Sequence, residues 1–128
     1  MKIVMIADDS PVIRKVARRL LEDMELVVVE AGDGAQAISM CRDNMPDILI
    51  IDWDMPGRSG VDVVAEIARM PASENTVIFY CTSELNISEM TKAKRAGAKG
   101  FLMKPFNRTI LHKKFMEVGV VNPDEQAA

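Results

Sequence analysis

Three carboxylates stand where short apolar runs of the sequence end. Asp8 and Asp9 follow one such run, and Asp52 follows the uninterrupted apolar run Ile48–Ile51. A run without alternating polar residues is typical of a strand buried on both faces of a parallel sheet. Carboxylates that meet at one place repel one another unless a cation neutralises them, and Mg²⁺ prefers oxygen ligands. The sequence therefore predicts a Mg²⁺ site if these strand ends converge.

Two further polar residues extend this set. Thr82 follows the predicted strand at residues 76–81, and Lys104 follows the predicted strand at residues 100–103. A lysine ammonium and a threonine hydroxyl are suited to bind phosphoryl oxygens, and Asp52 is suited to attack phosphorus as a nucleophile. Such a site needs little other protein chemistry. The pattern favours phosphoryl transfer to Asp52.

The intervening elements alternate between strands and helices. We predict strands at residues 2–7, 26–31, 47–52, 76–81 and 100–103. We predict helices at residues 11–23, 61–70 and 87–96, another after Gly34 that Pro46 ends, and a last one that Asn107 caps. Five strand–helix units predict an α/β fold with a five-stranded parallel sheet and right-handed crossovers. Because the carboxyl ends of parallel strands share one edge, the polar residues should converge there.

The first predicted helix, residues 11–23, shows the helical pattern well. Ser10 is suited to cap it, and Pro11 lacks only an N–H that the first turn does not need. Its apolar residues recur at spacings of three and four, so we expect one buried stripe. The members of this stripe are Ile13, Val16, Ala17, Leu20 and Leu21.

Length and composition restrict the function classes. The 128 residues suffice for a domain with its own core, and 48% hydrophobic and 27% charged residues are typical of a soluble globular protein. The net charge of −3 argues against wholesale binding of nucleic acid. No apolar run approaches the ~20 residues of a membrane span, and the first residues indicate a strand rather than a signal peptide.

Domain organisation and compartment follow from similar observations. We expect one domain at residues 1–119, a short tail at residues 120–128 and no output domain. Cys41 and Cys81 lack C-x-x-C spacing, so we expect free buried thiols in a reducing compartment. The protein is therefore expected in the cytoplasm.

In these residues the chain resembles the response-regulator receiver domains of two-component signalling, of the stand-alone chemotaxis (CheY-like) kind. The resemblance covers Lys2 to about Val118. It rests on five motifs in order: Asp8-Asp9; Asp52 with Met55-Pro56-Gly57 and Gly60; Thr82-Ser83; Ala96-Gly97-Ala98; and Lys104-Pro105-Phe106. The resemblance implies a doubly wound, flavodoxin-like fold with strand order 2-1-3-4-5. It also implies a phosphoacceptor that assists its own phosphorylation and dephosphorylation rather than an enzyme with a separate substrate.

The resemblance assigns roles to the carboxylates. Asp52 would accept the phosphoryl group from the phosphohistidine of a histidine kinase or a histidine phosphotransfer protein. Asp9 and Asp52 would bind Mg²⁺ directly, with help from the backbone carbonyl of Asp54, and Asp8 would act through water. Asp54 departs from the neutral or basic residues that are commoner at this place in the family, which leaves the lifetime of the phosphate open.

The resemblance assigns further roles at the ends of the last two strands. Thr82 and Lys104 would contact the phosphoryl oxygens, and the peptide between Lys104 and Pro105 would be cis. Phe101 takes the place of the family's switch aromatic, which turns inward once Thr82 moves toward the phosphoryl group. Because Phe101 has no hydroxyl, such a switch would depend on packing.

The charge distribution indicates a partner surface. Residues 91–116 contain no Asp or Glu, and eight basic residues fall there: Lys92, Lys94, Arg95, Lys99, Lys104, Arg108, Lys113 and Lys114. Solvated helix faces account for some of them. The alternative is a basic surface for an acidic protein target, formed by the fourth helix, fifth strand and fifth helix, which is also the family's output surface. Lys92, Arg95, Lys99 and Phe101 are its candidate residues, and a small anionic ligand is a further alternative.

Other functions remain open at this point. A haloacid-dehalogenase-type phosphatase also places Asp-x-Asp after an apolar strand, as Asp52 and Asp54 are placed here. A binding module that is never phosphorylated is the second alternative. For the receiver interpretation we expect a monomer that binds neither DNA nor membranes, and dimerisation on phosphorylation stays open.

Overall fold

A five-stranded parallel sheet forms the centre of the protein. The computed structural model describes residues 2–120, so the predicted tail at residues 120–128 lies outside this range except for Val120. The strands are β1 (Ile3–Ala7), β2 (Val27–Ala31), β3 (Ile48–Asp52), β4 (Val77–Thr82) and β5 (Gly100–Met103). They are arranged in the order β2-β1-β3-β4-β5, and every neighbouring pair is parallel. The predicted strand order is confirmed.

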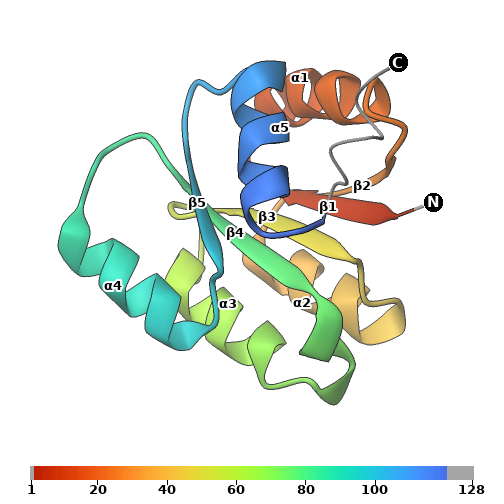
Figure 1. The fold of residues 1–128 in the computed structure, drawn as a ribbon. Helices are drawn as coiled ribbons and strands as arrows, with labels where there is room; N and C mark the ends of the chain where they lie inside the picture. Colours follow the sequence, from red (N-terminus) through yellow and green to blue (C-terminus); the bar gives the residue numbers. More distant parts are fainter. Residues whose placement is uncertain (1, 121–128) are drawn as a thin grey trace.

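Helices cover both faces of this sheet (Figure 1). One face carries α1 (Pro11–Glu22) and α5 (Arg108–Glu117), and the other carries α2 (Gly34–Asp43), α3 (Gly60–Ala68) and α4 (Ile87–Ala96). Each face buries its own apolar cluster, with Leu21 and Phe115 in the first and Ile38 and Ile67 in the second. The predicted doubly wound α/β architecture is confirmed.

The register of the sheet aligns the strand ends at one edge. Ala7 of β1 is paired with Ile51 of β3, and Asp52 at the end of β3 is paired with Cys81 of β4. Every residue of β3 is buried, as expected of a central strand covered on both faces. The residues that follow β1, β3, β4 and β5 are thereby brought to the same edge.

Two details differ from the sequence predictions. Val16 was placed in the buried stripe of α1, but it is 56% exposed, because α1 rests on the sheet along Ala17 and Leu21. A short 3₁₀-helix, Pro71–Asn75, follows α3 where no element was predicted. It lies between the end of α3 and Thr76, a segment too short and too polar to show helical periodicity.

Two composition-based expectations are addressed by the same structure. Cys41 and Cys81 are both buried and free, as predicted. Within residues 2–120, no helix combines the length and the apolar character that crossing a membrane requires.

Candidate functional site at the carboxyl edge of the sheet

The β1 end of the site is tightly hydrogen-bonded. The backbone N–H of Asp8 donates to the carbonyl of Ala31 in β2 at 3.0 Å. The backbone N–H of Ser10 donates to Oδ1 of Asp8 at 2.9 Å, and the Ser10 hydroxyl accepts from the N–H of Ile13 to cap α1. Asp8 is buried, whereas Asp9 is exposed and makes no ion pair among residues 2–120.

Asp52 lies at the end of the buried strand β3, and the chain turns sharply after it. Asp52 is 5% exposed. Gly60 packs against this turn so closely that a Cβ at its position would lie 2.8 Å from the Cα of Trp53 and 2.9 Å from the carbonyl oxygen of Asp52. Only glycine therefore fits there.

Lys104 joins the two buried carboxylates. Its Nζ lies 2.7 Å from Oδ2 of Asp8 and 2.8 Å from Oδ1 of Asp52. Burial lowers the pKa of Lys104, but its hydrogen bonds and charge interactions with Asp52 and Asp8 together outweigh burial and raise the pKa above its usual value. The lysine is thus held in its charged form between the ends of β1 and β3.

The carboxyl of Asp52 experiences opposing influences. Burial raises its pKa, the ammonium of Lys104 lowers it, and the charges of Asp8 and Asp9 raise it again. The net effect is a raised pKa, because desolvation and two like charges outweigh one cation. A second cation at this place would favour the ionised form of Asp52.

The three carboxylates predicted to meet do meet. Asp8, Asp9 and Asp52 each offer an oxygen, and these oxygens lie within 4.8 Å of one another. A compact set of carboxylate oxygens fits a hard divalent cation such as Mg²⁺. Asp54 stands apart from this set: it is exposed, and its backbone forms an isolated antiparallel bridge with Ser59.

Thr82 lies at the end of β4 and is buried, but its hydroxyl is engaged by the following loop. It donates to the carbonyl of Glu84 at 2.9 Å and accepts from the N–H of the same residue at 3.1 Å. The backbone carbonyl of Thr82 accepts from the N–H of Lys104 at 2.8 Å. The threonine therefore joins the edge of the sheet to the loop between β4 and α4.

Comparison with known proteins shows which family the chain belongs to. A family model described as the response regulator receiver domain matches residues 4–116. The chain belongs to this family. The chemotaxis protein CheY of Halobacterium salinarum is 36% identical over 107 residues, which cover 84% of this chain and 88% of that protein. CheY of Pseudomonas aeruginosa is 28% identical over 116 residues, covering 90% and 94% of the two chains.

Solved structures agree with this assignment. The chemotaxis protein CheY4 of Vibrio cholerae is 31% identical in sequence, with a TM-score of 0.87 over 92% of this chain and 98% of that one. Receiver domains of the CheY type act as phosphoacceptors in phosphorelay signalling, so this is the class of function to which the chain belongs.

Two expectations derived from the receiver resemblance are addressed by the geometry. The peptide between Lys104 and Pro105 is cis, as predicted. Phe101 is half-buried, and its ring meets the ring of Tyr80 edge-on, with centroids 6.5 Å apart and an interplanar angle of 84°. The hydroxyl of Tyr80 is buried and makes no hydrogen bond of normal geometry among residues 2–120, and its pKa is raised by burial and by the nearby carboxylate of Glu89.

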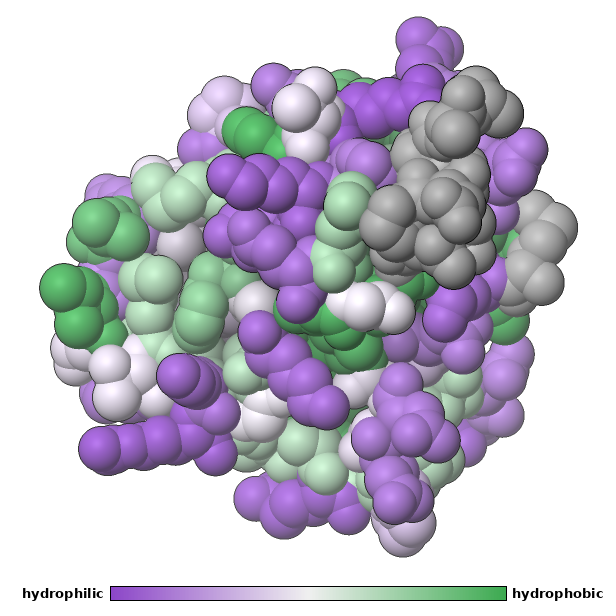
Figure 2. All heavy atoms as spheres, viewed as in Figure 1, coloured by the Kyte–Doolittle hydropathy of each residue, from purple (hydrophilic) through white to green (hydrophobic). Residues whose placement is uncertain are grey.

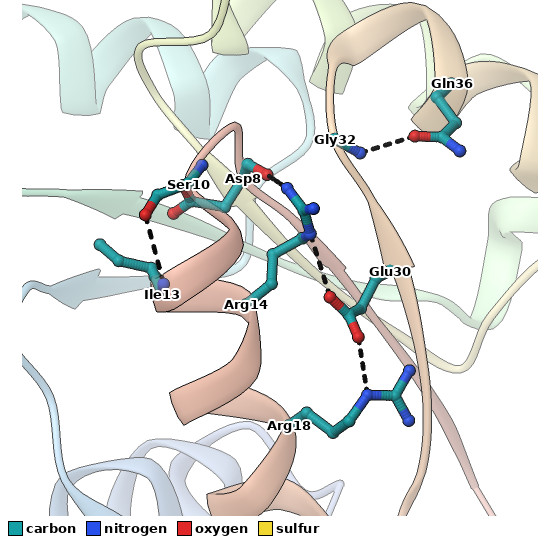
Figure 3. A network of polar contacts seen from close by, with 8 residues as sticks. All are labelled: Asp8, Ser10, Ile13, Arg14, Arg18, Glu30, Gly32 and Gln36. Atoms are coloured by element: carbon teal, nitrogen blue, oxygen red, sulfur yellow. Dashed lines mark hydrogen bonds and ion pairs between the residues drawn. The ribbon is translucent and has the colours of Figure 1, made fainter.

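Sequence reasoning missed a polar network beside the receiver site. Arg14 of α1 donates to the backbone carbonyl of Asp8 and to Glu30 of β2, and Arg18 also contacts Glu30 (Figure 3). A signal was present, because Glu30 is the only charged residue in the otherwise apolar strand β2. Its partners on α1 became apparent only once the helix was placed against the strand.

Proposed function

We propose that Asp52 accepts a phosphoryl group from a phosphohistidine in a two-component pathway, and that this changes a protein-binding surface. The observation that carries the proposal is the meeting of Asp52 with Asp8, Asp9 and Lys104 at one edge of the sheet. A buried carboxylate beside a lysine and two further carboxylates is suited to phosphoryl transfer.

The proposed step exchanges one bond to phosphorus for another. A carboxylate oxygen of Asp52 attacks phosphorus, and a P–O bond forms while the N–P bond of the donor breaks. The electron pair returns to the imidazole nitrogen, which takes up a proton from solvent. Lys104, already 2.8 Å from Asp52, stabilises the negative charge on the transferring oxygens. Hydrolysis of the acyl phosphate by water later restores the carboxylate.

Asp8, Asp9 and Asp52 are proposed to hold Mg²⁺, with the backbone carbonyl of Asp54 as a further ligand. The ion would neutralise carboxylate and phosphoryl charge. Asp9 is the carboxylate best placed to bind it directly, since it is exposed while Asp8 is occupied by Lys104 and Ser10. Asp8 is accordingly assigned a role through water.

A groove beside the site offers a place for the phosphodonor. It measures about 530 Å³, and its lining includes Val12, Val16, Pro105 and Phe106 together with Lys104. The exposure of Val16, which the helical pattern placed in the core, is accounted for if a donor helix packs here. We propose that the groove receives the apolar face of the phosphohistidine protein.

The output surface is assigned to α4, β5 and α5. Exposed apolar side chains gather at the start of α4, where Figure 2 shows hydrophobic surface beside hydrophilic side chains, and Leu85 and Ile87 are over 70% exposed there. The exposed basic residues of this surface include Lys92, Arg95 and Lys99. Apolar anchors with a basic border fit an acidic protein target.

The switch between site and surface is assigned to Thr82 and Phe101. Thr82 is held by Glu84, and a phosphoryl group on Asp52 would compete for the same hydroxyl. Release of Glu84 would free the loop that leads into α4, and Phe101 would turn further inward against Tyr80. The protein is proposed to act in the cytoplasm as a monomer, without binding DNA or membranes, and any dimer would form on phosphorylation.

The direct test is the intact mass of the protein after incubation with phosphoramidate, a small N–P donor, with and without Mg²⁺. We expect a Mg²⁺-dependent gain of one phosphoryl group in the wild type and none in Asp52→Asn. Fluorescence of Trp53, which follows Asp52, should change on adding Mg²⁺. No gain in mass and no change in fluorescence would refute the proposal and favour a binding module that is never phosphorylated.

The phosphatase alternative is distinguishable in the same preparation. A haloacid-dehalogenase-type mechanism needs Asp54 to act beside Asp52, but Asp54 lies outside the carboxylate group. Continuous release of p-nitrophenol from p-nitrophenyl phosphate, lost in Asp54→Asn, would support a phosphatase. We expect none.

A further inference from the structure

Arg14 holds the peptide that links the two acidic residues at the end of β1. Its Nη1 donates to the backbone carbonyl of Asp8 at 2.7 Å, and its Nε donates to Oε1 of Glu30 at 3.0 Å. The arginine side chain is only 19% exposed. Figure 3 shows the guanidinium between the Asp8 backbone and the Glu30 carboxylate.

The carbonyl of Asp8 belongs to the same planar peptide unit as the N–H of Asp9. Fixing the oxygen of a planar peptide fixes the direction in which the next Cα leaves it. Asp9 itself has no ion pair or side-chain hydrogen bond among residues 2–120. What the structure fixes for this exposed carboxylate is the backbone that carries it, and Arg14 is the side chain that holds this backbone from the α1 side.

The positive charge of Arg14 is offset by carboxylates that lie outside the acidic site. Glu30 also accepts from Nε of Arg18 at 2.7 Å, and Nη1 of Arg18 donates to Oε2 of Glu22 at 3.3 Å, so two carboxylates face the two guanidiniums. The hydrogen bond from Arg18 is the largest influence that lowers the pKa of Glu30, and the bond from Arg14 lowers it further, so the carboxylate stays ionised. Neutralised in this way, the guanidinium can lie near a cation site without strongly repelling the cation.

We propose that Arg14 is a positioning residue for the divalent cation: by holding the Asp8 carbonyl it fixes the peptide that carries Asp9, and it thereby strengthens cation binding. This rests on the proposed Mg²⁺ site. Arginine is required because its fork spans two acceptors at once, whereas a lysine ammonium is a single point of charge. Outer contacts of this kind typically change metal affinity about tenfold or more when removed.

The test measures Mg²⁺ affinity alone, by calorimetric titration with MgCl₂ and by Trp53 fluorescence, with no phosphodonor present. Arg14→Lys keeps the charge and loses the fork, and Arg14→Gln loses the charge. If Arg14 acted only by charge, Lys would leave the affinity unchanged and Gln would tighten it. Under the proposal both variants weaken Mg²⁺ binding, by about tenfold.

The matched control is Arg18→Lys. Arg18 lies on the same helix and contacts the same Glu30, but it makes no hydrogen bond to Asp8. We expect its Mg²⁺ affinity to stay within about twofold of wild type. An equal loss of Mg²⁺ affinity in Arg18→Lys would mean that Arg14 only stabilises α1, and it would overturn the proposal. Wild-type Mg²⁺ affinity in Arg14→Lys would overturn the proposal as well.

A second readout separates positioning from damage to the fold. Phosphorylation of Arg14→Lys by phosphoramidate should need about tenfold more Mg²⁺ but reach the wild-type rate at saturation. A lowered rate at saturating Mg²⁺ would contradict the inference. If the wild type bound no Mg²⁺, the proposed function would fail as well, whereas normal wild-type binding with unchanged variants defeats only the role of Arg14.

Discussion

Two connections at the same edge of the sheet are built in opposite ways. The β1–α1 connection, residues 8–10, is held by Ala31 through the backbone of Asp8, by the Ser10 N–H on its carboxylate and by Arg14 on its carbonyl. The β4–α4 connection, residues 83–86, is exposed throughout. Its link to the sheet edge runs through the hydroxyl of Thr82, which bonds the backbone of Glu84.

The contrast teaches which part of the site is fixed and which part is free to change. Carboxylates that bind a cation gain affinity from being held in place beforehand. A segment that must respond to phosphorylation needs a low free energy of local rearrangement. The first connection suits binding, and the second suits a response.

The largest effect is expected where the two connections are joined. Lys104 contacts Asp8 with its side chain, and its backbone bonds Thr82. Lys104→Ala would leave two buried carboxylates without their cation and lower the free energy of unfolding by about 3 kcal/mol. Urea denaturation measures this, and added Mg²⁺ should restore much of the loss. Lys99→Ala, which removes an exposed lysine, serves as control, and equal stability of both variants would contradict the prediction.

The same lysine predicts a dependence on alkaline pH. Its folded-state pKa is raised above the usual 10.5, so its stabilising contribution is complete below that pH and is lost as the pH rises through the folded pKa. Thermal denaturation between pH 9 and about 12 should show a steeper loss of stability in the wild type than in Lys104→Met. Parallel curves would show that the ion pairs of Lys104 do not stabilise the fold.

The same residues show how much of the site could be predicted from the sequence. That Asp8, Asp9, Asp52 and Lys104 would meet was predictable, because parallel strands bring their carboxyl ends to one edge whatever the side-chain details. The engagement of Thr82 by Glu84 was not predictable, since a loop of four exposed residues has no periodicity to read.

Other features could not be predicted from the sequence, for a different reason. The contact of Arg14 with Glu30 depends on how closely α1 packs against the edge strand β2. The spacing of residues along the sequence gives no information about that distance. Val16 satisfied the helical period and was still exposed, because α1 has more apolar positions than the sheet covers. Surplus apolar surface of this kind is visible only when the buried face is known.

A smaller effect is expected for the hydroxyl of Thr82, which links the sheet edge to the β4–α4 connection. Thr82→Ala removes both hydrogen bonds to Glu84 and should lower the free energy of unfolding by about 1 kcal/mol. Amide hydrogen exchange should accelerate in residues 83–86 and stay unchanged in residues 8–10. Thr82→Ser keeps the hydroxyl and is the control. Faster exchange in both connections would contradict the contrast drawn between them.

The smallest effect is expected for Tyr80, which lies in β4 just before the β4–α4 connection. Its hydroxyl is buried beside Glu89 but makes no hydrogen bond of normal geometry, so Tyr80→Phe should change the free energy of unfolding by less than about 1 kcal/mol. Thr76→Val is the matched control, because the buried Thr76 hydroxyl donates to the Pro46 carbonyl at 2.8 Å, and its removal should cost about 1 kcal/mol. A comparable loss in Tyr80→Phe would show that its hydroxyl has a partner after all.

The two buried cysteines make the protein convenient to label at chosen places. Burial raises the pKa of Cys41 to about 11 and that of Cys81 to about 12, so neither forms the reactive thiolate near neutral pH. A cysteine introduced on the surface, such as Ser88→Cys in the first turn of α4, would then be the one thiol in residues 2–120 open to a maleimide dye. A fluorophore attached there would report movement at the start of α4 in real time, without removal of either native cysteine.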